Sequence, residues 1–335
     1  MNYDSLDREL NNELRSIYLL YGEEQYLVDM AVKKIKKKFG ELLLGINYIV
    51  IDETNLENLI SDIEMPAFGY DKKLIIVKNS GLFKKDGRKK TATPFQEKIG
   101  NYISDNLNII NEGVVLVFIE KEIDKNSIYD IIERTGIVCQ IDLLKPYQIV
   151  AKLKKICSLY KVSAQDMALN YLIETSGTSL QELINEIRKL IEYVGENGEI
   201  TEKEVEMLAT KQMESVIFDL TDSLGSKQTE QALQVLDNLI YQKEPLQKIL
   251  ITLYNHFKKL YLCKMALDLN KDIVNALNLK PNQTFLVTKY KKQASYFKEN
   301  DLKQILDEFV NLDYNSKIGN IDIDVGLRSI LCRYC

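Results

Sequence analysis

One short segment of this chain has the position that phosphate chemistry requires, but not the residues. A phosphate-binding loop has the pattern G-x-x-x-x-G-K-[ST] between a strand and a helix, where backbone amides and the lysine hold phosphates and the hydroxyl holds magnesium. At that position the chain reads YGEEQYL: Gly22 is present, the lysine is missing, and Glu23 and Glu24 stand where a polyphosphate would lie. Because like charges repel, we expect a degenerate phosphate loop that binds no nucleotide.

The other residues that hydrolysis or acid–base chemistry would use are also few. The apolar segment VVLVFIEK supplies Glu120 alone where adjacent acids would hold magnesium. The single histidine, His256, lies in LYNHFKKLYL without a nearby acid or nucleophile, so we expect a surface or half-buried helix position rather than a catalytic one. We predict no catalytic residue, no cofactor and no ATPase activity for the chain alone. The alternative is an NTPase with an unconventional site, or an unrelated α/β enzyme.

The cysteines predict neither a disulfide framework nor a metal site. There are five, an odd number without regular spacing, which suggests reduced thiols in a cytoplasmic protein. Cys332 and Cys335 form a C-x-x-C without a second pair, so two incidental cysteines are expected rather than a zinc site. The acidic, polar beginning MNYDSLDRELNNEL is unlike a secretory signal, and no apolar run approaches the roughly 18 residues that span a bilayer. We predict a cytoplasmic protein with no membrane association.

The composition describes an ordinary globular protein with more than one domain. The 335 residues are 45% apolar and 28% charged, and the formal net charge is −5. That charge argues against a surface that binds nucleic acid everywhere, although local basic patches are compatible with it. A stand-alone nucleic-acid-binding regulator is a third hypothesis, which the acidic charge and the lack of a compact recognition motif disfavour.

The order of the expected elements indicates an α/β domain followed by helices. Apolar runs that predict strands lie at 17–21, 48–51, 74–77, 114–119 and 138–141. Amphipathic segments that predict helices lie at 23–39, 56–63, 180–194, 216–224, 229–241, 246–268, 284–297, 301–312 and 324–331. Strands that alternate with helices favour a mostly parallel sheet. The predicted fold is therefore α/β plus all-α, with an α/β domain at 1–145, a small helical domain at 146–212 and a helical bundle at 213–335.

Segments spread over the whole chain carry a family resemblance. They are YLLYGEEQYLVDMAVKKI, PAFGYDKKLIIVKN, SGTSLQELINEIRKL, VIFDLTDSLG, and Asp313, Lys317 and Gly319. Their order and spacing resemble the delta subunit of the bacterial DNA polymerase III clamp loader. The resemblance implies a degenerate AAA+ module, a lid domain, and a collar domain that assembles with the other loader subunits, delta prime and gamma/tau. It also implies a subunit without ATPase activity that binds the sliding clamp (beta subunit) and helps open its ring for loading on primed DNA during replication.

An apolar tetrapeptide, MPAF, stands where polar turn residues are expected between a helix and a strand. Connecting segments run over the surface, so an apolar side chain there is buried locally or kept for a partner. The resemblance implies that Ala67 and Phe68, flanked by Met65 and Pro66, enter an apolar pocket on the clamp. Ala67 is smaller than the family's usual residue, so Phe68 or Met65 would supply more of the contact. The alternative is that Phe68 folds under the sheet as a core residue.

Two basic segments are compatible with DNA binding. The loop KKDGRKK carries the candidate phosphate contacts Lys84, Lys85, Arg88, Lys89 and Lys90. A solvated loop without a DNA contact is the alternative. The segment KYKKQASYFK interleaves lysines with aromatic residues that could stack on single-stranded DNA, but its helical spacing favours Tyr290 and Phe297 as core residues of the bundle.

Overall fold

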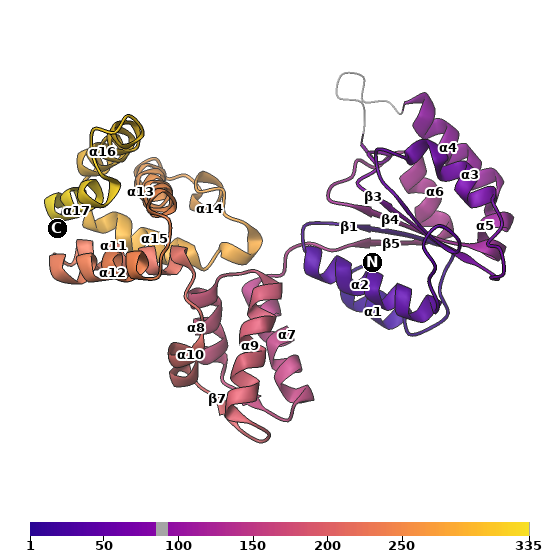
Figure 1. Cartoon of the computed structure of the whole chain (residues 1–335), viewed down its shortest axis with the longest axis horizontal. Helices are drawn as coiled ribbons and strands as arrows, with labels where there is room; N and C mark the ends of the chain where they lie inside the picture. The colour runs from indigo at the N-terminus through magenta and orange to yellow at the C-terminus, as the bar shows by residue number, and fades with distance from the viewer. Residues whose placement is uncertain (85–92, 335) are drawn as a thin grey trace. The chain divides into compact units, whose positions relative to one another are not determined.

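The computed structural model describes residues 1–84 and 93–334, and the chain forms two compact units, Met1–Leu143 and Leu144–Cys335 (Figure 1). The first unit is α/β and the second is almost entirely helical, so the predicted fold class is confirmed. Within the described residues, none of the helices combines the length and the apolar composition that a membrane crossing needs.

The first unit is built on a five-stranded parallel sheet with the strand order β2-β3-β4-β1-β5. Its strands are β1 (Ile17–Tyr21), β2 (Tyr48–Ile51), β3 (Lys73–Lys78), β4 (Val114–Glu120) and β5 (Ile137–Gln140), each within one residue of the predicted bounds. All seven residues of β4 are buried, because β4 lies between β3 and β1 and both of its faces are covered. Since the strands are parallel, their carboxyl ends share one edge of the sheet and their amino ends share the other.

Helices cover both faces of this sheet. They are α1 (Tyr3–Glu9), α2 (Gln25–Phe39), α3 (Leu59–Glu64, after the 3-10 turn Leu56–Asn58), α4 (Pro94–Asp105), α5 (Leu107–Gly113) and α6 (Ser127–Thr135). Alternate strand residues, among them Leu19, Ile75 and Phe118, pack with α3 to α6 in one core cluster. Figure 1 shows α1 and α2 across the opposite face.

The second unit begins with four helices and a minimal strand pair. The helices are α7 (Pro146–Leu159), α8 (Asp166–Ser176), α9 (Leu180–Val194) and α10 (Glu202–Leu208). The two-residue strands β6 (Ser163–Ala164) and β7 (Glu199–Ile200) form the parallel pair. This pair was not predicted, because two residues are too few to show the alternation of a strand.

The rest of the second unit packs around one central helix. Its elements are α11 (Met213–Gly225), α12 (Thr229–Tyr241), α13 (Leu246–Asp268), α14 (Ile273–Ala276), the 3-10 turn Pro281–Gln283, α15 (Leu286–Tyr296), α16 (Glu299–Lys317) and α17 (Ile323–Tyr334). Buried residues of α13 recur every three or four positions, as at Ile249, Leu253, Phe257 and Leu260. They belong to the apolar core that α13 shares with α11, α15, α16 and α17.

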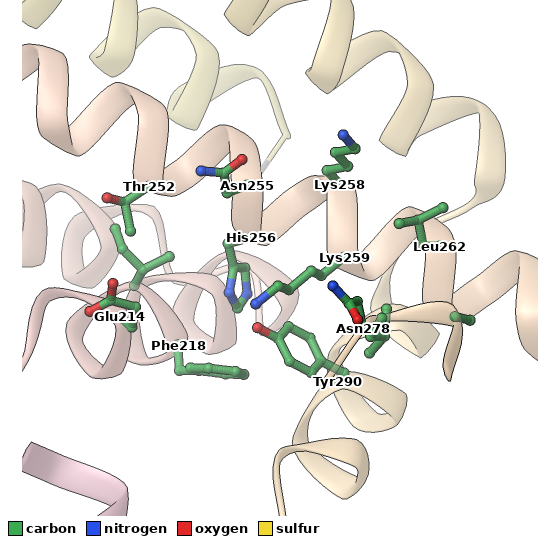
Figure 2. A pocket seen from close by; sticks show the side chains of 13 residues that line it. Glu214, Phe218, Thr252, Asn255, His256, Lys258, Lys259, Leu262, Asn278 and Tyr290 are labelled. Carbon is green, nitrogen blue, oxygen red and sulfur yellow. The ribbon is translucent and has the colours of Figure 1, made fainter. Parts of the chain in front are cut away.

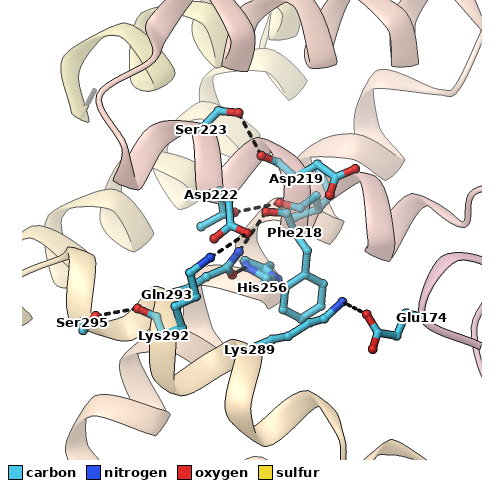
Figure 3. A network of polar contacts seen from close by, with 12 residues as sticks. Glu174, Phe218, Asp219, Asp222, Ser223, His256, Lys289, Lys292, Gln293 and Ser295 are labelled. Atoms are coloured by element: carbon cyan, nitrogen blue, oxygen red, sulfur yellow. Dashed lines mark hydrogen bonds and ion pairs between the residues drawn. The ribbon is translucent and has the colours of Figure 1, made fainter. Parts of the chain in front are cut away.

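Two of the three aromatic residues of the 289–298 segment, Tyr290 and Phe297, lie in this core, and Tyr296 is half-buried against it. Tyr290 is 3% and Phe297 6% exposed, so the prediction that they are core residues is confirmed. Two lysines of the same segment form ion pairs, Lys289 with Glu174 and Lys292 with Asp222 (Figure 3). Neither Tyr290 nor Phe297 is available to stack on a base.

His256 is also a core residue, and the expected surface or half-buried position is wrong. It is 5% exposed, and its Nε2 lies 2.8 Å from Oε1 of Gln293 (Figure 3). The Gln293 side-chain amide donates to the carbonyl of Phe218 at 2.8 Å, which leaves its oxygen to accept from the imidazole. This arrangement assigns the proton of the neutral ring to Nε2. The partner lies 37 positions further along the chain, on α15, where sequence inspection around His256 cannot find it.

Burial lowers the pKa of His256 to about 4, which predicts an acid-sensitive bundle. The unfolded chain, with a histidine pKa of about 6.5, takes up the proton before the folded chain does. The stability of the folded state should therefore fall as the pH drops through this range, by about 2 kcal/mol between roughly pH 7 and pH 5 from this group alone. Urea unfolding of the wild type and of His256→Gln at both pH values would measure the contribution as the difference between the two proteins. Because the chain has one histidine, an imidazole NMR signal that titrates near its ordinary pKa would contradict the prediction.

Candidate functional site

In the connection between β1 and α2, backbone amides that a phosphate loop would leave free donate to carbonyls of the protein itself. The connection consists of residues 22–24. The amide of Gly22 donates to the carbonyl of Glu120 at 3.2 Å, and the amide of Glu24 donates to the carbonyl of Ile141 at 3.1 Å. Gly22 has a φ of +137°, and a Cβ at this residue would lie 2.2 Å from the Ile141 oxygen. The surviving glycine therefore serves a close approach to the segment after β5 rather than a bound phosphate.

The carboxylate of Glu120 is likewise engaged within the protein. Glu120 ends β4 and is 4% exposed. Its Oε1 accepts hydrogen bonds from the amide of Ser80 at 2.9 Å and from the hydroxyl of Ser80 at 2.6 Å. Burial raises the pKa of Glu120, and the hydrogen bonds from Ser80 oppose that rise. Among the described residues, no cluster of three or more histidine, cysteine or acidic side chains could hold a metal ion, and Cys335 lies outside those residues.

The second unit contains a cavity of about 410 Å³ with several polar side chains in its lining (Figure 2). His256, Lys259 and Tyr290 line it, and burial lowers the pKa of Lys259. A nucleophile that pairs with a base is not found among the described lining residues: the hydroxyl of Thr252 donates to the carbonyl of Lys248, and Nε2 of His256 faces Gln293. Burial also raises the pKa of Tyr290, so its phenol stays neutral. The cavity thus offers polar contacts, including Lys259, and the charge of Glu214 opposes the lowering of its pKa.

The MPAF segment presents its aromatic residue to solvent. Helix α3 ends at Glu64, and Phe68 is 73% and Met65 53% exposed. The amide of Tyr70 donates to the carbonyl of Ala67 at 2.7 Å, closing a tight turn with Phe68 at its corner. Gly69 has a φ of +82°, the value that the third position of a type II turn requires. Phe68 is therefore not a core residue.

A buried lysine, which the sequence reasoning missed, lies directly beneath this loop. Lys73 is the first residue of β3 and is 2% exposed. Its ammonium group donates to the carbonyl of Asp62, in the last turn of α3, and to the carbonyl of Met65. Burial lowers the pKa of Lys73, and the charge of Asp62 opposes that shift. A signal was present in the sequence, since a lysine opening the apolar strand KLIIVK must either reach solvent or find acceptors.

A second apolar loop lies beside the first. Residues 41–47 precede β2 as the MPAF segment precedes β3, and β2 and β3 are neighbours in the parallel sheet, so both loops lie at the amino edge. Leu44 is 75% and Ile46 42% exposed. A cavity of about 300 Å³ between the loops is lined by Gly45, Ile46, Ile49, Asp62, Met65, Pro66, Phe68 and Lys73. We call Leu44, Ile46, Met65 and Phe68 the amino-edge patch.

The basic loop is described only at its beginning. Lys84 is exposed, and its backbone carbonyl accepts a hydrogen bond from the Gln96 side chain at 2.7 Å. Lys85, Arg88, Lys89 and Lys90 lie outside the described residues. Contact of this loop with DNA stays a prediction.

Comparison with known proteins identifies relatives of both units. Residues 18–140 match the family described as DNA polymerase III, delta subunit, and residues 214–334 match its C-terminal domain. A protein from Aquifex aeolicus (strain VF5), named probable DNA polymerase III subunit delta, is 32% identical over 323 residues, which are 94% of this chain and 90% of that protein. The DNA polymerase III subunit delta of Bacillus subtilis (strain 168) is 24% identical over 322 residues, 92% of this chain and 90% of that protein.

The fold is also similar to a solved structure. A Bacillus subtilis DNA clamp loader delta protein matches with a TM-score of 0.77 and 22% sequence identity, over 99% of each chain. At that identity the likeness shows a shared fold, whereas the Aquifex relative shows the family. This chain belongs to the DNA polymerase III delta subunit family.

Proposed function

We propose that this chain binds the sliding clamp through the Met65–Phe68 loop and helps open the clamp ring for loading on primed DNA. The observation that carries the proposal is the exposed side chain of Phe68, held at the corner of a closed turn. Exposed apolar residues that gather on one surface are typical of binding sites, and Leu44, Ile46 and Met65 extend this surface. An aromatic anchor that a partner's pocket buries contributes roughly 2–4 kcal/mol to binding.

The proposed mechanism is mechanical rather than chemical. A subunit that binds the open clamp more tightly than the closed clamp shifts the ring toward the open form, by no more than the difference between the two binding free energies. The chain needs no nucleotide for this, and ATP would act through other subunits that expose or cover the amino-edge patch. The engaged amides of Gly22 and Glu24 support a subunit without catalytic activity of its own.

We further propose that the second unit is divided into a lid at 146–212 and a collar at 213–335, and that the collar binds delta prime and gamma/tau. Exposed apolar residues on α13 and α16 support a subunit interface there. Ile251 is 51%, Val310 54% and Tyr314 63% exposed. An apolar cavity of about 160 Å³ beside them is lined by Leu250, Ile251, Tyr254, Phe309, Val310 and Asp313. Primed DNA would contact the basic loop that begins at Lys84.

Phe68→Ala should weaken binding to the purified sliding clamp at least about tenfold, because the variant loses the aromatic anchor. The melting temperature should stay nearly unchanged, because Phe68 is exposed in the free chain. Phe95→Ala, at a 37% exposed phenylalanine of the same unit, is the matched control and should bind normally. Surface plasmon resonance with immobilised clamp measures both affinities. Normal clamp binding by Phe68→Ala would reject the proposal, and tight DNA binding without clamp binding would favour a DNA-binding regulator instead.

The purified chain should neither bind nor hydrolyse ATP, and removal of negative charge should not restore binding. In Glu23→Gln the charge repulsion is reduced, but the amides of Gly22 and Glu24 still donate to backbone carbonyls. Calorimetric titration with millimolar ATP and magnesium, together with a phosphate-release assay, tests both proteins. Saturable binding by Glu23→Gln would show that charge, and not the engaged backbone, excludes the nucleotide.

A further inference from the structure

We propose that Lys73 is a positioning residue for clamp binding, because its ammonium group fastens the start of the Met65–Phe68 loop to the sheet. The inference rests on the proposed role of Phe68. Lys73 itself is buried and does not belong to the exposed amino-edge patch, so it would act only through the loop.

The ammonium group of Lys73 is bound at the carboxyl end of α3. The last carbonyls of a helix have no partner within the helix, and a positive charge near them is favourable. Lys73 supplies both a donor and a charge at this position: it donates to Asp62 in the last turn of α3 and to Met65, the residue that caps the helix. One side chain of β3 thereby holds the end of α3 and the beginning of the loop.

The contact of Lys73 with Met65 lies close to Phe68 along the chain. Between Met65 and the turn that opens at Ala67 there is only Pro66, whose ring fixes its φ angle. The Ala67–Tyr70 hydrogen bond then fixes the turn on the other side of Phe68. A loop held at both ends loses little conformational entropy on binding, which increases affinity without a new contact. If the Lys73 contact is lost, the competent loop conformation becomes less populated and the apparent affinity falls in proportion.

Lys73 occupies a buried position, where a charged side chain is unusual. Burial of an ammonium group is unfavourable, and apolar residues of similar volume often replace buried ions without loss of stability. A methionine would therefore suit a residue that merely fills the space between α3 and β3. The lysine gives both carbonyls a donor and so fixes their positions, which an apolar residue of similar volume would not do.

The experiment measures clamp affinity for Lys73→Met, Phe68→Ala and the double variant. Lys73→Met should bind the clamp about tenfold more weakly, whereas Lys72→Met should stay within about twofold of the wild type. Lys72 is the matched control, since it is the adjacent exposed lysine and its ammonium group donates instead to Asn111 at 3.3 Å. In the Phe68→Ala background, Lys73→Met should lower the clamp affinity less than about twofold, because the aromatic anchor that Lys73 would position is absent. A purely structural role would give equal losses in both backgrounds.

The outcomes separate this inference from the proposed function. If Phe68→Ala weakens binding and folded Lys73→Met does not, the positioning role is rejected and the proposed function stands. If Phe68→Ala binds normally, the proposed function is rejected as well. Melting temperatures identify a Lys73→Met protein that does not fold. In that case Lys73→Arg is measured instead, because arginine keeps a cation with several donors. A clamp affinity within about threefold of the wild type supports the inference. A loss of affinity as large as that of Phe68→Ala overturns it.

Discussion

The backbone amides between β1 and α2 donate to carbonyls at the end of β4 and just after β5, and this constraint decides which groups the first unit leaves free at that edge of the sheet. In open parallel sheets, ligands bind at the carboxyl edge, where strand ends and helix amino termini meet. Here Gly22 allows the chain to lie against Ile141, and the amides that would face a phosphate donate to backbone carbonyls. The carboxylate of Glu120 at the same edge is occupied by Ser80. The polar groups at this edge are thus bound to one another rather than free for a ligand.

The amino-edge patch lies at the opposite edge of the sheet. The loops before β2 and β3 are brought together there because the two strands are parallel neighbours. Exposed apolar side chains that gather on one surface are typical of binding sites. The amino-edge patch combines this exposure with a constrained backbone, since Lys73 and the Ala67–Tyr70 turn fasten the loop at both ends. Rigid presentation lowers the entropy that binding would otherwise cost.

The second unit is stabilised by a core of apolar side chains around α13, and a polar path runs through it. His256 and Gln293 join α13 to α15, and Gln293 continues the path to the carbonyl of Phe218 on α11. A buried polar group requires such partners, and each partner restricts how the helices can slide against one another. The exposed apolar residues of α13 and α16 lie outside this core. The same helices therefore offer one face to their own bundle and another to solvent.

The sequence alone determined the features that depend on local periodicity. The five strands of the first unit's sheet and many of the helices followed from the spacing of apolar residues, because side-chain direction repeats every two or 3.6 residues. The MPAF segment was evident from its apolar composition between a predicted helix and a predicted strand. Tertiary structure decided the features that depend on residues far apart in the chain. The packing of elements sets the exposure of Phe68 and the contact of Lys73 with α3. It also places the loop before β2 beside the loop before β3, and it pairs His256 with Gln293. Local spacing indicates which way a side chain points, but only the assembled fold shows what it meets there.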